Sequence, residues 1–165
     1  LVPETTLFRS SYGEKQVLKN IDGEVNSGEQ WLLQGHNGSG KSTLLSLLNG
    51  DHPQAYANEI YLFGQKRGSG ESIWDIKEKI GMISPELHWY FDMNTNVGQT
   101  LASGFFDSMS LYQKLSFDQQ LQLEQILYFF DLKEDTNKKL NKLPLGKQRL
   151  AFLARTSIKK PKIQI

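Results

Sequence analysis

Residues 35–43 read Gly-His-Asn-Gly-Ser-Gly-Lys-Ser-Thr. This stretch fits the pattern G-x-x-x-x-G-K-[ST] of a phosphate-binding loop. Glycines let such a loop curl tightly, and the helix behind it points unpaired N–H groups and the positive end of its dipole at a polyphosphate. The apolar run at residues 31–34 predicts a buried strand before the loop, and the run at 44–48 predicts a helix after it. This strand–loop–helix context argues against an accidental match.

The motif gives its residues distinct roles. Lys41 is the candidate catalytic residue, because its ammonium group would reach the β- and γ-phosphates. The Ser42 hydroxyl would bind Mg²⁺. The predicted nucleotide-binding residues of the loop are Gly35, Asn37, Gly38, Ser39, Gly40, Lys41, Ser42 and Thr43. His36 occupies a variable position of the pattern, and the chain's scattered histidines do not predict a metal site.

The composition is that of one ordinary globular domain. The 165 residues include 38% hydrophobic and 22% charged residues, and the net charge is +1. This balance gives no electrostatic case for nucleic acid or for a membrane surface. Cysteine is absent, which excludes disulfides and thiolate metal sites. No apolar run approaches the roughly 18 residues of a membrane span, and the first residues do not predict a signal peptide.

Periodicity and turn residues predict a mixed α/β protein. Strands are predicted at residues 5–11, 17–25, 31–34, 59–64, 80–83 and from 162 onward. Helices are predicted at residues 41–50, 72–79, from 95 onward, near 118–130 and at 146–158. Ser72 is a candidate N-cap, and Ser116 precedes the helix near 118–130.

With these flanking features the chain resembles the nucleotide-binding domain of ABC-type ATPases over essentially its whole length. Tyr12 lies where this family has an aromatic residue that stacks on adenine. Residues 80–83 resemble the strand leading into the family's Q-loop, and residues 160–165 resemble the approach to its Walker B strand. The signature-like residues are Pro144, Leu145, Gly146, Lys147 and Gln148. Residues 103–108 are similar to a subgroup of molybdenum-transport or photorepair-type ATP-binding proteins.

The resemblance implies a fold. This fold is an α/β P-loop NTPase core with a mixed sheet, an antiparallel β subdomain at the N-terminus and a helical subdomain. Within a single domain of residues 1–165, it implies an ATP-binding core and β subdomain at 1–94. A helical subdomain at 95–147 and a return to the core at 148–165 would follow.

The resemblance also implies an activity and partners. ATP and Mg²⁺ are the implied cofactors, with N–H groups from Gly38 to Lys41 around the β-phosphate. A second ABC domain would bind head to tail, so that each phosphate loop faces the other domain's signature. The implied location is cytoplasmic, with peripheral association at the inner face of the membrane through a transmembrane permease. No direct nucleic-acid partner is expected.

The chain departs from the family pattern in three places. Ser84-Pro85-Glu86 occupies the register of the Q-loop glutamine, so Glu86 is a candidate Mg²⁺ ligand, with a solvated loop acid as the alternative. Pro144 replaces the signature serine and has neither hydroxyl nor N–H, and Lys147 replaces the usual Gln or Glu. The family's Mg²⁺-binding Asp, catalytic Glu and switch His would lie beyond Ile165, so we expect a chain truncated before Walker B.

These departures leave more than one function open. The leading hypothesis is an ATP-hydrolysing subunit of an ABC transporter or related ABC protein. The alternative is an ATP-binding switch or catalytically impaired remnant, which Pro144 favours. A P-loop small-molecule kinase or GTPase is a third, although the guanine-reading Asn-Lys-x-Asp is absent. Tyr12 has plain packing as its alternative role, and residues 89–91 are either an exposed docking surface or buried.

Overall fold

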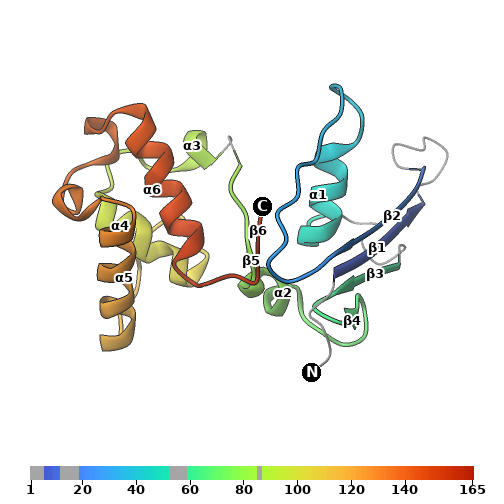
Figure 1. The fold of residues 1–165 in the computed structure, drawn as a ribbon. Helices are drawn as coiled ribbons and strands as arrows, with labels where there is room; N and C mark the ends of the chain where they lie inside the picture. The colour runs from blue at the N-terminus through green and yellow to red at the C-terminus, as the bar shows by residue number, and fades with distance from the viewer. Residues whose placement is uncertain (1–5, 12–18, 53–58, 85–86) are drawn as a thin grey trace. The chain divides into compact units, whose positions relative to one another are not determined.

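The computed structural model describes residues 6–11, 19–52, 59–84 and 87–165 (Figure 1). The chain folds into two compact units. Unit 1 is Leu1–Lys77 and unit 2 is Glu78–Ile165.

Unit 1 contains a four-stranded antiparallel sheet in the order β2-β1-β3-β4 (Figure 1). Its strands are β1 (Thr6–Ser11), β2 (Lys19–Val25), β3 (Glu59–Leu62) and β4 (Gln65–Lys66). Phe8 lies opposite Gly23 on one side and Ile60 on the other, which places β1 inside the sheet. The β3–β4 turn has positive φ at both Phe63 and Gly64, the twist that suits a tight hairpin. The predicted antiparallel β subdomain is confirmed.

Helix α1 (Lys41–Asn49) packs Leu44 and Leu47 into the core of unit 1. Ile60, Leu62 and Ile76 of unit 1 are also buried. The helix ends where Gly50 adopts a left-handed φ of 79° and its N–H donates to Leu47 O. A Cβ at Gly50 would lie 2.6 Å from Arg67 Nη2 and from Ile73 Cδ1. Glycine is therefore required both by the backbone and by the close approach of its neighbours.

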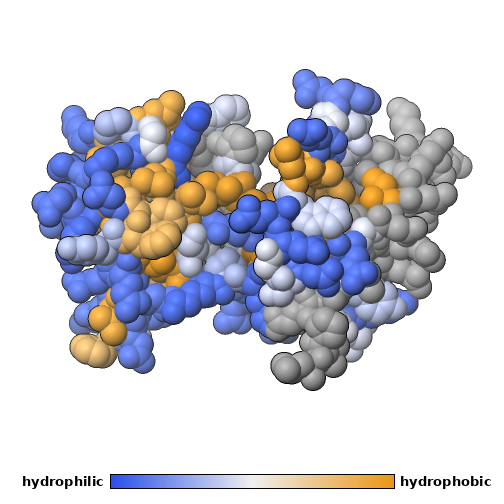
Figure 2. Space-filling view, viewed as in Figure 1, coloured by the Kyte–Doolittle hydropathy of each residue, from blue (hydrophilic) through white to orange (hydrophobic). Residues whose placement is uncertain are grey.

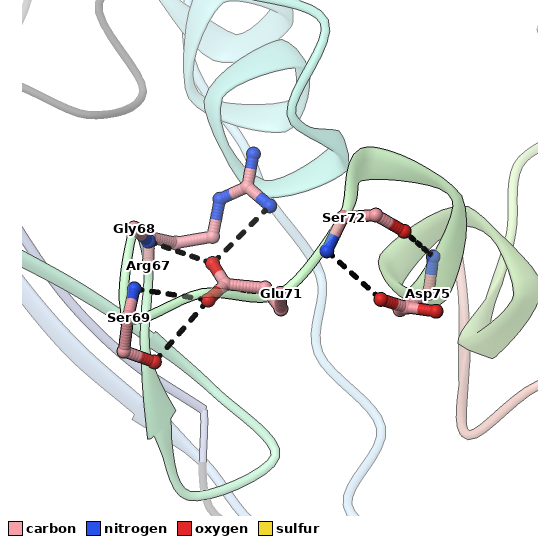
Figure 3. Close-up of polar contacts among 6 residues, drawn as sticks. All are labelled: Arg67, Gly68, Ser69, Glu71, Ser72 and Asp75. Atoms are coloured by element: carbon pink, nitrogen blue, oxygen red, sulfur yellow. Dashed lines mark hydrogen bonds and ion pairs between the residues drawn. The ribbon is translucent and has the colours of Figure 1, made fainter.

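The segment between β4 and helix α2 (Ile73–Lys79) is held by two carboxylates (Figure 3). Glu71 accepts hydrogen bonds from Gly68 N at 2.7 Å and from Ser69 N at 3.0 Å. Burial raises the pKa of Glu71, but these backbone hydrogen bonds outweigh it and leave the pKa below its ordinary value. Ser72 and Asp75 exchange side-chain-to-backbone hydrogen bonds of 2.8 and 3.2 Å, the arrangement of a capping box. The predicted N-cap at Ser72 is confirmed.

Unit 2 is mainly helical (Figure 1). Its helices are α3 (Leu87–Tyr90), α4 (Val97–Ala102), η2 (Ser103–Phe106), α5 (Phe117–Phe129), η3 (Lys133–Asp135), η4 (Leu140–Lys142) and α6 (Leu145–Ser157). Two short parallel strands, β5 (Ile80–Gly81) and β6 (Ile163–Gln164), pair beside them. Backbone bonds from Ile83 N to Ile165 O and from Ile165 N to Gly81 O extend this pairing.

The core of unit 2 forms where α4 packs against α5 and α6. Val97, Leu101 and Leu127 are buried there, and Phe91 meets Phe152 edge to face with ring centroids 5.3 Å apart. Ser116 and Gln119 form a complete capping box at the start of α5. The pattern at residues 97, 101 and 105 predicts continuous helix, but α4 gives way to the 3₁₀ turn η2 after Ala102.

The predicted buried strand at residues 31–34 is wrong. Trp31, Leu32 and Leu33 are 62%, 79% and 44% exposed. No strand among the described residues pairs with this stretch, and Trp31 Nε1 instead donates to the Glu29 carboxylate at 2.9 Å. A continuous apolar run is typical of a strand that is paired in a sheet and covered on both faces, and this run has neither cover nor a strand partner among the described residues. The apolar run alone therefore does not determine the secondary structure of residues 31–34, which depends on neighbouring strands.

Apolar side chains also gather on the surface of unit 2, among polar ones (Figure 2). The exposed large apolar and aromatic residues described there are Trp89, Tyr90, Met109, Tyr112, Phe117, Leu121, Tyr128, Phe129 and Leu145. Exposure and burial divide residues 89–91 between them. Trp89 and Tyr90 are exposed, whereas Phe91 lies in the core.

Candidate nucleotide-binding site

The phosphate loop lies directly before α1, as the motif predicts. Gly38 and Gly40 have φ values of 81° and 91°, which L-residues with a Cβ rarely adopt. Gly40 is the N-cap of α1, its carbonyl accepts from Leu44 N at 2.9 Å, and no side chain caps the helix. A Cβ at Gly35 would come within 2.5 Å of Ser39 Oγ. The loop is thus a tight backbone turn closed by glycines.

Lys41 reaches back across this turn. Its Nζ donates to Gly35 O at 2.7 Å and to His36 O at 2.9 Å. An ammonium group has three donors, so one remains for a ligand after these two bonds. Ser39 N donates to His36 O at 3.2 Å and closes the loop further. The lysine that the motif assigns to phosphate therefore also fixes the shape of the loop that surrounds it.

The electrostatics of this turn suit an anion. The first turn of α1 carries no acidic residue. Its first N–H groups have no acceptor within the helix, and they lie at the positive end of the helix dipole. Ser42 is exposed and Lys41 and Thr43 are half-buried, so these groups are accessible from solvent. The donor set, which is backbone N–H groups, one ammonium and two hydroxyls, fits a polyphosphate.

The donor set for Mg²⁺ is smaller. Ser42 offers one exposed hydroxyl. Within the part of the chain that the structure describes, no group of three or more histidine or acidic residues could hold a metal ion. One protein oxygen is nevertheless consistent with Mg²⁺, which usually keeps several waters and takes its remaining ligands from the substrate phosphates. Tyr12, Pro85 and Glu86 lie outside the described residues.

The signature-like residues form the start of α6 in unit 2. Pro144 is the N-cap of this helix and provides no side-chain cap. Leu145 is 53% exposed, and a Cβ at Gly146 would meet nothing within 4 Å. Gln148 turns its Nε2 to Leu143 O at 2.8 Å, while its backbone N donates to Pro144 O at 3.1 Å. Lys147 is the one charged residue in this first turn.

Lys147 is held by an acid that sequence reasoning missed. Its Nζ lies 2.5 Å from Asp135 Oδ2, and Lys138 Nζ lies 2.6 Å from Asp135 Oδ1. The Asp135 side chain is only 4% exposed. Hydrogen bonds from Lys138 and then from Lys147 hold the pKa of Asp135 below its ordinary value, and the bond to Asp135 raises the pKa of Lys147. The sequence shows Asp135 next to Glu134 in a lysine-rich stretch and gives no sign that Asp135 alone is buried.

Arg155 is a second residue that sequence reasoning missed. It is buried on α6, where Nε donates to Ser103 Oγ at 3.1 Å and Nη2 donates to Ser108 O at 2.8 Å. Its guanidinium lies 5.2 Å from the centre of the Phe91 ring, within cation–π range. Burial lowers the pKa of the Arg155 guanidinium. This side chain fastens residues 103–108 to α6, and the apolar periodicity of α6 alone could not identify it.

Comparison with known proteins identifies the family of the chain. The model of the ABC transporter family matches residues 18–165. The ABC transporter ATP-binding protein ModF of Escherichia coli is 45% identical over 156 residues, which cover 94% of this chain and 32% of ModF. An uncharacterized ABC transporter ATP-binding protein of Schizosaccharomyces pombe is 36% identical over 93% of this chain and 32% of its own length. The chain spans about a third of the length of these two relatives.

Solved structures show the same fold. The chain superposes on cbiO1 of Clostridium perfringens with a TM-score of 0.82 at 21% identity, covering 98% of this chain and 64% of cbiO1. It superposes on the ADP conformation of MJ1267, an ATP-binding cassette, with a TM-score of 0.75 at 21% identity, covering 99% of this chain and 68% of MJ1267. None of the helices that the structure describes combines the length and apolar character required to cross a bilayer. The predicted α/β P-loop fold is confirmed, and the chain belongs to the ABC transporter family as an ATP-binding domain.

Proposed function

We propose that the chain binds ATP with Mg²⁺ through residues 35–43 and hydrolyses it as the nucleotide-binding subunit of an ABC transporter or related ABC protein. The observation that carries this proposal is the uncapped N-terminus of α1 behind a glycine turn, with Lys41 folded across it. Backbone N–H groups and an ammonium group converge there without a nearby acid in the helix. Such an arrangement stabilises the charge of a polyphosphate.

The roles of the residues follow from their chemistry. The N–H groups from Gly38 to Lys41 would orient the β-phosphate, and the remaining donor of Lys41 would stabilise charge on the γ-phosphoryl group as it transfers. The Ser42 hydroxyl would hold Mg²⁺, which when bound neutralises charge between the β- and γ-phosphates. Tyr12 would stack on the adenine and Glu86 would contact Mg²⁺; both assignments rest on the family resemblance.

The proposal extends to partners. A second ABC domain would bind head to tail, with residues 144–148 of each domain facing the phosphate loop of the other. Such a pair is isologous when the two domains are identical. CbiO1, which shares the fold, is described as part of the ABC transporter complex cbiONQ. For this chain we propose a cytoplasmic location and, by analogy, a membrane permease as the partner that closure would drive.

Measuring ATP affinity and ATP turnover on the same sample tests this function. The proposal expects both, with turnover lost in Lys41→Ala because the group that stabilises the γ-phosphoryl charge is gone. Phosphate release would be followed in the presence of Mg²⁺, with a GTP competition to exclude a guanine-specific site. Binding that persists with GTP strongly preferred over ATP would contradict the ATP assignment.

A second candidate function is an ATP-binding switch that hydrolyses little. Pro144 favours it, because the N-cap of α6 has no hydroxyl to offer a γ-phosphate. The same two measurements separate the candidates. ATP binding together with no turnover that Lys41→Ala could lower would establish the switch, and Lys41-dependent turnover would exclude it.

A further inference from the structure

A buried carboxylate in unit 2 pairs with two lysines at once. Asp135 Oδ1 contacts Lys138 Nζ at 2.6 Å and Oδ2 contacts Lys147 Nζ at 2.5 Å. The Asp135 side chain is 4% exposed, whereas Lys138 and Lys147 are 58% and 41% exposed. A buried charge requires a partner, and one ammonium group is enough to neutralise one carboxylate. Lys138 alone would therefore balance the charge of Asp135, so the ion pair with Lys147 must serve another purpose.

Asp135 is fixed by the backbone around it. Gly98 N donates to Thr136 O at 2.9 Å and Val97 N donates to Lys138 O at 3.0 Å. Further along, Leu140 N donates to Thr95 O and Asn141 N donates to Met93 O. These bonds tie residues 136–141 to residues 93–98, and Leu132 and Leu140 are fully buried on either side. The backbone that carries Asp135 is thus held in place, so its carboxylate can hold the Lys147 side chain.

Lys147 lies in an unfavourable place without this partner. It is in the first turn of α6, where a cation opposes the helix dipole. This turn has no side-chain cap and no acidic residue of its own. Asp135, from outside the helix, supplies the negative charge that the turn lacks. The ion pair therefore both compensates the helix end and links it to the fixed segment.

We propose that Asp135 is a positioning residue for the signature-like residues 144–148. It fixes the first turn of α6 through Lys147, while Lys138 keeps the carboxylate neutralised. The proposal rests on the proposed function, in which this turn faces the ATP of a second domain. Asp135 touches neither nucleotide nor the reacting atoms, so it acts through the geometry of α6.

Three substitutions in the intact protein separate positioning from general stability. Asp135→Asn keeps the shape and removes the charge, and Asp135→Glu keeps the charge. Lys138→Met is the matched control, because it removes the other partner of the same carboxylate and leaves Lys147 paired. Deuterium uptake by the peptide 143–150 reports the order of the first turn of α6. Uptake by the α5 peptide 117–129 reports the stability of the rest of unit 2.

The proposal expects exchange at 143–150 in Asp135→Asn to rise well beyond any rise at 117–129, which reports the general loss of stability. Turnover in Asp135→Asn falls about tenfold, because small misplacements of a site are costly, while ATP affinity stays at the wild-type value. Asp135→Glu restores both readouts, and Lys138→Met matches wild type in both. Unchanged exchange at 143–150 in Asp135→Asn overturns the proposal, as does a Lys138→Met effect equal to that of Asp135→Asn.

The proposed function fails in a different way. Absence of turnover in the wild-type protein contradicts hydrolysis, and the exchange experiment still decides whether Asp135 positions α6. Conversely, wild-type turnover in Asp135→Asn together with Lys41-dependent turnover in the wild-type protein retains the function and removes the positioning role.

Discussion

At the scale of single residues, the most informative charges are those with two hydrogen-bond partners each. Lys41 donates to two carbonyls of its own loop, and Asp135 accepts from two lysines while buried. The motif pattern identifies Lys41, Ser42 and the loop glycines, because their chemistry demands a fixed spacing. Asp135 and Arg155 could not be identified in this way, since burial depends on distant segments such as residues 93–98 and 103–108.

The ion pairs of Asp135 make a pH-dependent contribution to stability. The pKa of Asp135 is lower in the folded protein than its ordinary value of 3.8, so the unfolded chain binds the proton more tightly. The stabilisation is therefore fully present above that ordinary value and is lost as pH falls through the depressed folded pKa. At pH 7 we expect Asp135→Asn to lower the free energy of unfolding by about 1–3 kcal/mol.

Urea unfolding at neutral pH and at about pH 2.5 measures the difference in unfolding free energy between wild type and Asp135→Asn. This difference should narrow in acid as the wild-type carboxylate is protonated. Glu134→Gln is the matched control, because Glu134 is the exposed neighbour of Asp135. A difference between wild type and Asp135→Asn that stays constant across this range would contradict the assignment.

At the scale of elements, the two ends of α1 set the site. The N-terminal end forms the phosphate loop, and the C-terminal end closes at Gly50 against Arg67 and Ile73. Lys77 and Asn49 both contact Asp51 just beyond this end. The helix that carries the loop is therefore anchored at the end opposite the phosphate loop, so its anchoring can be changed without altering the loop.

Substitution of Gly50 tests this anchoring. Gly50→Ala should lower the free energy of unfolding by about 1–3 kcal/mol more than Gly28→Ala, because the added Cβ must displace buried neighbours. Gly28 is the control: its φ of 85° resembles the 79° of Gly50, but a Cβ there meets nothing within 4 Å. Gly28→Ala should cost about 1 kcal/mol from the backbone alone. Thermal or urea unfolding measures both, and equal losses would show that Gly50 has no packing role.

Element prediction succeeded where the signal is local. The cap at Ser72, the helix that follows Ser116 and the hairpin strands of unit 1 follow from side-chain hydrogen bonding and apolar spacing within a few residues. It failed at residues 31–34, where an apolar run needs partners from elsewhere in the chain. It also failed to predict the change from α4 to η2, since the helical spacing of apolar residues continues through it.

At the scale of the whole molecule, the sequence identifies the family more firmly than the activity. The ABC family match, the 45% identity to ModF and the shared fold with cbiO1 agree with the motif and the flanking segments. The phosphate loop in unit 1 is a glycine turn with Lys41 bonded across it. In unit 2, Pro144 is the N-cap of α6, and Lys147 in its first turn pairs with Asp135. The proposal of nucleotide binding therefore rests on the geometry of residues 35–43. The proposal of turnover rests on the family and on a site that a second domain would complete.

The most direct test of nucleotide binding by residues 35–43 is a calorimetric titration with Mg–ATP. Wild type should bind, and Lys41→Ala should weaken the affinity about ten- to a hundredfold, the value of one hydrogen bond to a charged group. Lys114→Ala removes the same charge from an exposed loop of unit 2 and should bind like wild type. Equal affinity of wild type and Lys41→Ala would contradict the central claim.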